Sequence, residues 1–214
     1  MMNEVYLTTA YLAPIQYYSK LFHAGRAVIE RYDHYLKQTY RNRCSIAGAN
    51  GALSLSVPII KPDNPKTFSS DIRISDHGNW QHLHWHAICS AYNSSPFFEY
   101  YADDFSPFYR KKYTWLFDFN EELRRLICCL LEIDPLVSLS ECYSKALPSA
   151  DFRDTIHPKK DFRQTDPSFV VKEYYQVFRH KYGFLENLSI IDLLFNTGPE
   201  ARLILQSSHK NESR

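Results

Sequence analysis

The sequence has few of the features that mark membrane, secreted or nucleic-acid-binding proteins. Its 214 residues carry a formal net charge of +1, so no broad basic field is present to attract nucleic acid. No apolar run approaches the roughly 20 residues that a membrane span needs. The N-terminus carries the acidic Glu4 and lacks the basic and apolar regions of an export signal. We therefore expect a cytoplasmic protein that binds no nucleic acid and has no membrane span.

The motifs of several enzyme classes are missing as well. The five cysteines are odd in number and form no CxxC pair, which argues against a disulfide scaffold. The chain has no glycine-rich phosphate loop, no Ser-His-Asp order and no nucleotide-binding fingerprint. These patterns leave the cofactor and the oligomeric state unknown.

Aromatic residues, in contrast, are abundant. They make up 15% of the chain, with 16 Tyr and 14 Phe. Tyrosine combines a large apolar body with a polar tip, so it suits the wall of a sugar, base or peptide site. The alternative is that these rings only pack in the core and on the surface.

The first 30 residues predict a strand, a helix and a second strand. Residues 5–10 form an apolar run, Pro14 suits the opening of a helix that ends at Gly25, and residues 27–30 form a second apolar run. These are the parts of a parallel crossover unit, which presents ligands at the carboxyl ends of its strands. The residues expected at that rim are Thr8, Thr9 and Tyr11 on one side and Tyr32, Asp33 and His34 on the other.

Further strands are expected soon after this unit. An Asn-Gly turn between residues 44–46 and 53–57 predicts a hairpin, and the alternation of residues 71–75 predicts another strand. The expected fold is α/β or α+β, with a small mixed sheet from the N-terminal third and helices packed on it. We expect a single domain over residues 1–207 and a frayed tail over residues 208–214.

The rest of the chain predicts helices. Asn79 can cap a helix over residues 80–92, and Asp118 can cap an amphipathic helix on which Arg124 and Arg125 face outward. Shorter helices are expected on both sides of Pro107, over residues 188–195, and after Gly198-Pro199.

A polar segment over residues 151–169 separates these helices. Asp151-Phe152-Arg153 recurs there as Asp161-Phe162-Arg163. Because two copies do not make a repeat architecture, we expect a long functional or mobile loop.

One face of the helix over residues 80–92 carries candidate chemistry. Trp80, His84 and Tyr92 recur on that face, and an imidazole suits acid-base catalysis. The alternative is a core histidine with a satisfied hydrogen bond.

A neighbouring stripe of the same helix holds His82, His86 and Cys89, with the spacing of a helical metal site. Neither an HExxH acid nor a further ligand motif accompanies them, so we expect no metal. Cys89 lies in an aromatic stretch that would raise the pKa of a thiol, which argues against a nucleophile.

Two other groups of polar residues are candidates for binding. Arg41 and Arg43, in a basic run over residues 37–43, can supply forked donors to a phosphate or carboxylate, or can simply be solvated. Asp192 and Asn196 lie one turn apart in an apolar helix, where buried polar groups need partners. A structural latch and an active-site carboxylate are both open interpretations of Asp192.

Four separated motifs follow one another along the chain. The first comprises Pro14, Tyr17 or Tyr18, and Lys20; the second comprises Tyr40, Arg41, Asn42, Arg43, Gly51, Val57 and Pro58. The third comprises Trp80, His84, Tyr92, Pro96 and Phe98; the fourth comprises Tyr175-Gln176 and the run from Leu188 to Gly198. Together they resemble the WbqC-like family over nearly the whole chain.

The resemblance implies a place in bacterial surface-polysaccharide biosynthesis, of O-antigen or capsule, with a sugar or sugar-nucleotide substrate. The expected activity is the transfer of a group such as an acyl or aminoacyl unit to a sugar. The alternative is a non-catalytic carbohydrate-binding or assembly protein of the same pathway. Relatives commonly carry a histidine where this chain has Thr8, and the region between Cys142 and Tyr174 is shorter than in the family.

These considerations assign residues to a site. The expected catalytic residues are His84, Tyr92 and Asp192. The expected substrate-binding residues are Arg41, Asn42, Arg43, Tyr40, Trp80, Gln176, Asn196 and Tyr11. The assignment requires residues 41–43, 84–92 and 192–196 to converge on a shared hollow.

Overall fold

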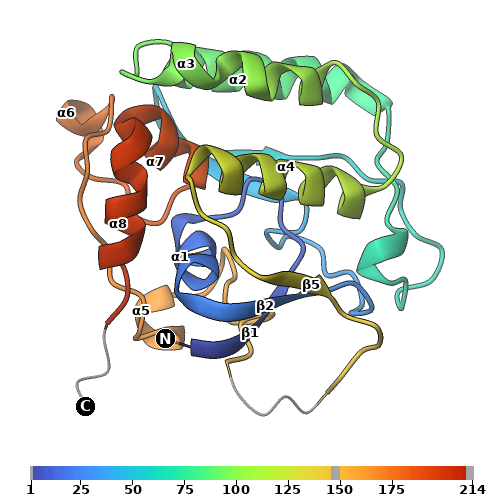
Figure 1. Cartoon of the computed structure of the whole chain (residues 1–214). Coiled ribbons are helices and arrows are strands. Elements are labelled where there is room, and N and C mark those ends of the chain that lie inside the picture. Colours follow the sequence, from blue (N-terminus) through green and yellow to red (C-terminus); the bar gives the residue numbers. More distant parts are fainter. Residues whose placement is uncertain (1, 146–149, 211–214) are drawn as a thin grey trace.

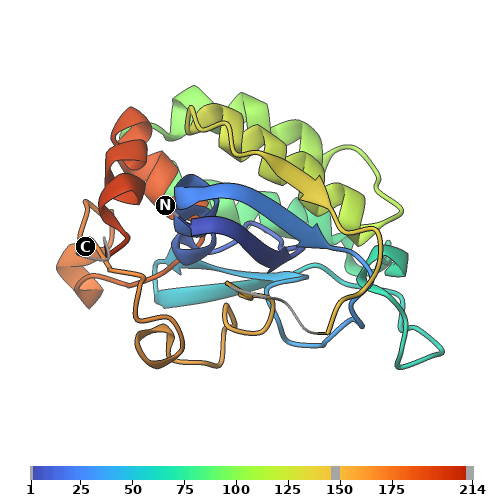
Figure 2. The same ribbon diagram turned by 60° about the horizontal axis from the view of Figure 1, so that its bottom comes forward.

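A parallel sheet lies at one side of the molecule. The structure is a computed structural model that describes residues 2–145 and 150–210. Within these residues β1 (Met2–Thr8), β2 (Ala24–Glu30) and β5 (Val137–Leu139) form a three-stranded parallel sheet in the order β1-β2-β5. Helix α1 (Ile15–His23) joins β1 to β2, which confirms the predicted crossover unit. Figure 2 shows the three strands side by side.

Burial explains why these residues form strands. Val5 and Ile29 are fully buried, and parallel strands that are covered on both faces need such apolar runs. Pro14 precedes α1 with an extended backbone, as predicted. The helix ends at His23, so Gly25 belongs to β2 and does not end the helix.

A separate antiparallel hairpin forms the second sheet. β3 (Arg43–Gly48) and β4 (Gly51–Ser56) pair with Gly48 opposite Gly51 across a two-residue turn. Gly51 has a φ of 100°, which glycine adopts without a Cβ penalty. The predicted hairpin and the α/β class are therefore confirmed. The parallel and antiparallel strands belong to different sheets, and β5 comes from outside the N-terminal third.

Helices cover the sheet in layers. Figure 1 shows α4 (Leu116–Leu130) between the parallel sheet and an outer layer of α2 (Trp80–Tyr92) and α3 (Phe98–Phe105). Helices α7 (Ile190–Thr197) and α8 (Ala201–Ser207) lie at one end of these layers. Every residue of α7 is buried, so this helix is a central part of the core.

The remaining elements are short. Helices α5 (Phe162–Thr165) and α6 (Arg179–Tyr182) each have four residues. Single 3-10 turns cover Ser69–Asp71, His77–Asn79, Ser106–Tyr109 and Gly198–Glu200. In the described part of the chain, no helix combines the length and the apolar character that crossing a membrane would require.

Two predictions about the strand and helix around residues 71–80 need correction. Residues 71–75 are not a strand: Arg73 and Ile74 make isolated bridges to Trp115 and Ile59. Pro58, next to Ile59, has no N–H with which a longer ladder could continue. Helix α2 begins at Trp80 as predicted, but Asn79 has a left-handed backbone and makes no side-chain cap bond.

The predicted outward position of Arg124 is wrong. Its side chain is buried because it pairs with Glu121 one turn earlier, at 2.8 Å between Nη2 and Oε2. Arg125 is exposed, as predicted. Helix α4 also begins two residues before Asp118, with Trp115 at the N-cap position.

The expected frayed tail falls into two parts. The Val170 N–H donates to the Ser208 carbonyl over 3.0 Å, and the Lys210 N–H donates to the Ser168 carbonyl over 2.9 Å. Residues 208–210 are therefore part of the fold and not a frayed end. Residues 211–214 lie outside the described residues.

Candidate functional site

The His84 side chain lies in a buried network of rings. Its Nδ1 is 2.9 Å from the Tyr11 hydroxyl, which is 2.9 Å from the Tyr109 hydroxyl. The Trp80 ring meets His84 edge-on, with the centroids 5.1 Å apart. Burial lowers the pKa of His84 to about 4, although a hydrogen bond to the Ser56 carbonyl opposes this shift. His84 is therefore neutral near pH 7 and already bonded within the protein.

Asp192 lies in a second network. Its carboxylate accepts hydrogen bonds from the Tyr92 hydroxyl at 2.8 Å, the Tyr174 hydroxyl at 2.6 Å and Gln176 Nε2 at 2.9 Å. Asn196 Nδ2 donates to the backbone carbonyl of Asp192 at 2.7 Å. Burial raises the pKa of Asp192 to about 6, and the three donors oppose that shift. Asp192 is fully buried, so the geometry favours the structural latch over an active-site carboxylate.

The side chains of residues 40–43 point to different partners. Arg41 forms an ion pair with Asp33, and Arg43 Nε donates to the Ser56 hydroxyl at 3.0 Å. Asn42 Nδ2 donates to the Val57 carbonyl at 2.9 Å. Tyr40 is half-buried, and its backbone carbonyl accepts from the N–H of Tyr11 at 2.9 Å.

The residues expected to share one hollow are thus spread over separate networks. Among the described residues, no hydrogen bond links the network of His84 to that of Asp192. The structure does bring Tyr92, Gln176, Asn196 and Asp192 together, but in the core. Of the expected site residues, Arg41 is the one that lines the cavity described next.

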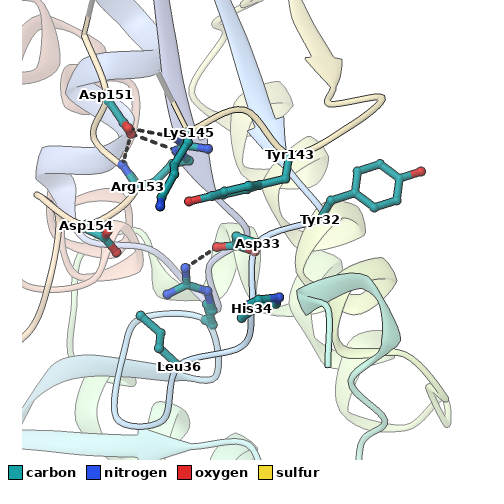
Figure 3. A pocket seen from close by; sticks show the side chains of 10 residues that line it. Tyr32, Asp33, His34, Leu36, Tyr143, Lys145, Asp151, Arg153 and Asp154 are labelled. Atoms are coloured by element: carbon teal, nitrogen blue, oxygen red, sulfur yellow. Dashed lines mark hydrogen bonds and ion pairs between the residues drawn. The ribbon is translucent and has the colours of Figure 1, made fainter. Parts of the chain in front are cut away.

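A cavity of about 390 Å³ opens at the carboxyl edge of the parallel sheet. We call it the edge pocket. It is lined by Tyr32, Asp33, His34, Leu36, Arg41, Tyr143, Lys145, Asp151, Arg153 and Asp154 (Figure 3). Tyr32, Asp33 and His34 follow β2, as the sequence predicted for the rim, and Tyr143 and Lys145 follow β5. Asp151 makes an isolated parallel bridge to Tyr6, which places the segment around Asp151 beside β1.

Arg153 holds this edge together. Its Nη1 donates to Glu30 at 3.0 Å, its Nη2 donates to Asp151 at 2.8 Å, and Nη2 also donates to the Ser144 carbonyl at 3.0 Å. Glu30 in turn accepts from the Ser140 hydroxyl at 2.6 Å. Burial raises the pKa of Asp151, but the hydrogen bonds and charge of Arg153 outweigh it and leave that pKa below its ordinary value. The ends of β2 and β5 and the segment beside β1 are therefore joined through one buried guanidinium.

A second buried pair, Arg41 with Asp33, lines the pocket. Arg41 Nε and Asp33 Oδ1 are buried and have no hydrogen-bond partner within the described ranges. Unsatisfied groups of this kind in a native fold call for water or a ligand. The pair therefore leaves one donor and one acceptor unsatisfied, and both atoms lie beneath the surface of the cavity.

Exposed side chains complete the wall. Tyr143 is 50% exposed, and the Arg153 guanidinium lies 5.2 Å from its ring centroid. Lys145 and Asp154 are exposed, and their side chains have no ion-pair partner in the described part of the chain. In Figure 3 Asp154 and Asp33 lie on opposite sides of the hollow, whereas the Tyr32 ring points away from it.

The sequence patterns missed the pocket residues that follow β5. Tyr143, Lys145 and Asp154 belong to no periodic pattern. The one sequence pattern near these residues was the near-repeat. Its first copy holds the buried Arg153, whereas Arg163 in its second copy is exposed. The predicted functional loop over residues 151–169 thus begins in the wall of the pocket.

The alternative candidates on α2 have little support. The His82 and His86 rings are 6.2 Å apart between centroids and both are exposed. Within residues 2–145 and 150–210, no group of three or more His, Cys, Asp and Glu side chains is arranged to hold a metal ion. Burial raises the pKa of the Cys89 thiol, which lowers the fraction present as nucleophilic thiolate.

The family model for the WbqC-like protein family matches residues 9–157, more than half of the chain. The chain belongs to the WbqC-like family. No curated protein and no solved structure matches this WbqC-like chain. The matched range contains the whole edge pocket, whereas Gln176, Asp192 and Asn196 lie outside it. The family match therefore covers the part of the chain that forms the pocket.

Proposed function

We propose that this WbqC-like protein acts in the cytoplasm in the biosynthesis of a bacterial surface polysaccharide and binds a sugar-containing substrate in the edge pocket. The family supports the pathway. The pocket supports the location, because it lies at the carboxyl ends of parallel strands, where α/β folds bind ligands. One feature carries the proposal: the half-exposed Tyr143 ring and the unpaired charges of Lys145 and Asp154 line a cavity of a size suited to small molecules.

The proposed reaction is the transfer of an acyl or aminoacyl group to the sugar. A hydroxyl or amine of the sugar attacks the carbonyl carbon of an activated acyl donor, and the leaving group departs with the electron pair of the broken bond. The proton of the attacking group passes to a base. We assign this role to His34 or Asp154, because both are exposed in the edge pocket. His84 is less suited, because it is buried and bonded to Tyr11.

A non-catalytic role in binding or assembly is the second candidate. Thr8 stands where relatives commonly carry a histidine, and its buried hydroxyl donates to the Thr9 carbonyl at 2.9 Å. This position therefore offers no imidazole for proton transfer. A chain without that group could still bind the sugar and hold it for another enzyme.

Deletion of the gene separates the two candidates. Loss of an acyl or aminoacyl substituent from the polysaccharide, with accumulation of the unmodified sugar precursor, supports the enzyme. Loss of polysaccharide without an accumulated precursor supports binding or assembly. An unchanged polysaccharide contradicts the proposed pathway.

A further inference from the structure

We infer that the edge pocket takes the sugar ring of its substrate and does not hold the diphosphate of a nucleotide-linked sugar. The inference rests on the proposed function and decides between its two substrate classes, a sugar and a sugar nucleotide. Three features carry it: the charge balance of the pocket, the occupied N-terminus of α1, and the mixture of unused donors and acceptors.

The charges that line the pocket cancel. Three cations, Arg41, Lys145 and Arg153, face three carboxylates from Asp33, Asp151 and Asp154. Two of the cations are already paired, Arg41 with Asp33 and Arg153 with Asp151 and the deeper Glu30. A diphosphate is an anion that needs unpaired cations or oriented N–H groups. Lys145 is the one lining cation with no carboxylate partner in the described ranges, and Asp154 offsets its charge.

The usual backbone site for a diphosphate is also occupied. In parallel α/β folds the N–H groups at the start of the helix after the first strand bind the diphosphate. In α1 the Ile15 N–H donates to the Leu188 carbonyl at 3.0 Å, and the Gln16 N–H donates to Asn187 Oδ1 at 3.0 Å. The Tyr17 N–H donates to the Pro14 carbonyl at 2.9 Å. The first turn of α1 therefore has no free donors to offer an anion.

The unpaired donors and acceptors that line the pocket suit the hydroxyl groups of a sugar. A hydroxyl both donates and accepts hydrogen bonds. Lys145 can donate and Asp154 can accept, and neither side chain has an ion-pair partner within the part of the chain that the structure describes. The half-exposed Tyr143 ring supplies a flat surface for the apolar face of a sugar. A volume of about 390 Å³ lies at the lower end of the range for small-molecule sites, roughly 300–1,000 Å³.

The test uses the full chain with two kinds of probe. The first is a mixture of common neutral and N-acetylated monosaccharides, and the second is uridine diphosphate or inorganic pyrophosphate at the same concentration. Saturation-transfer NMR detects the sugars and the nucleotide, and phosphorus line widths detect pyrophosphate. We expect contact to at least one monosaccharide, about tenfold weaker binding in Tyr143→Ala, and no contact to either anion.

A charge variant sharpens the test. Asp154→Asn removes one negative charge from the pocket without touching a buried pair, so this variant should gain measurable pyrophosphate binding. Asp103→Asn makes the same charge change at an exposed position on α3 and should gain none. The substituted positions Tyr143, Asp154 and Asp103 are exposed, so the variants are expected to fold.

The outcomes distinguish the inference from the proposed function. Binding of uridine diphosphate or pyrophosphate to the native protein, lost in Lys145→Ala, overturns the inference and leaves a sugar-nucleotide substrate. Binding of neither the sugars nor the anions contradicts both the inference and the proposed sugar site.

Discussion

Tyr92 donates a hydrogen bond of 2.8 Å to Asp192, although the two residues are 100 positions apart in the chain. The contact joins α2 to α7 inside the core, and the Tyr92 ring also packs edge-on against Phe195 at 5.3 Å between centroids. Tyr174 and Gln176 bring a third segment to the same carboxylate. The Asp192 network is therefore a latch that fixes the helical layer.

The latch has a testable pH dependence. The pKa of Asp192 is about 6 in the fold and 3.8 ordinarily, so the folded state binds the proton more tightly. Stability from this carboxyl is greatest at low pH and falls as the pH rises from about 4 to 6. Asp192→Asn should lower the free energy of unfolding by about 2 kcal/mol at pH 5, because donors lose their acceptor. The difference from the native chain should shrink by about 1–2 kcal/mol between pH 5 and 7.5 in urea unfolding.

Asp104→Asn is the matched control for this experiment. Asp104 is an exposed carboxylate on α3, so its substitution should change stability by less than about 0.5 kcal/mol at either pH. A difference between native and Asp192→Asn that grows with pH would contradict the raised pKa.

His84 should show the opposite trend. Its pKa is about 4 in the fold and 6.5 ordinarily, so the unfolded state binds the proton more tightly. The contribution of this imidazole to the free energy of unfolding is fully present above pH 6.5 and is lost as the pH falls toward 4. The advantage of the native chain over His84→Gln should therefore shrink by about 2 kcal/mol between pH 7 and 5. His82→Gln, at an exposed position on the same helix, should show no such change; a constant difference for His84→Gln would refute the assignment.

Lys20 and Asp166 form a buried ion pair at 2.7 Å that ties α1 to the loop over residues 151–169. Lys20→Met should cost about 3–5 kcal/mol in urea unfolding, because it leaves the Asp166 carboxylate buried without its cation. The double variant Lys20→Met, Asp166→Asn should cost less than the sum of the two single variants. Lys112→Met breaks the exposed pair with Asp76 and should cost less than about 1 kcal/mol. Additive effects at Lys20 and Asp166 would show that the pair is not coupled.

Arg153 should support the pocket as a positioning residue. Arg153→Lys keeps the charge but loses the forked contacts to Glu30 and Asp151, so it should cost about 1–3 kcal/mol and weaken sugar binding about tenfold. Arg163→Lys is the matched control, since Arg163 occupies the same place in the second copy of the near-repeat and is exposed. It should change neither quantity. Equal effects of the two substitutions would show that Arg153 does not position the pocket.

The elements that the sequence predicted well are those with local signals. Pro14 marks the start of α1, and Gly51, directly after the turn at Ala49-Asn50, has a positive φ that glycine adopts without a Cβ penalty. Residues 71–75 have the alternation of a strand but lack a partner with a continuous ladder, which no local pattern reveals. The outward position predicted for Arg124 was wrong for a related reason, because its side chain is buried in an ion pair with Glu121.

The site was predicted in part. Parallel pairing of β1 and β2 correctly indicated Tyr32, Asp33 and His34 as a rim. The other side of the predicted rim was wrong, because Thr8, Thr9 and Tyr11 are buried and do not line the pocket. The other wall depends on Arg153 meeting Glu30, 123 positions earlier in the chain, and no spacing rule encodes such a contact. His84 and Asp192 were conspicuous because buried polar groups need partners, but a sequence does not tell whether the partner is a ligand or the protein itself.

Complementation of a deletion strain tests the central claim, that the edge pocket is the functional site. The strain receives the native gene, Tyr143→Ala or Tyr175→Ala, at matched protein levels, and the composition of its surface polysaccharide is measured. Tyr143 is 50% exposed in the pocket, and Tyr175 is 55% exposed outside it, so the two substitutions remove similar surface rings. We predict that Tyr143→Ala fails to restore the native polysaccharide and that Tyr175→Ala restores it. Full restoration by Tyr143→Ala would contradict the assignment of function to the edge pocket.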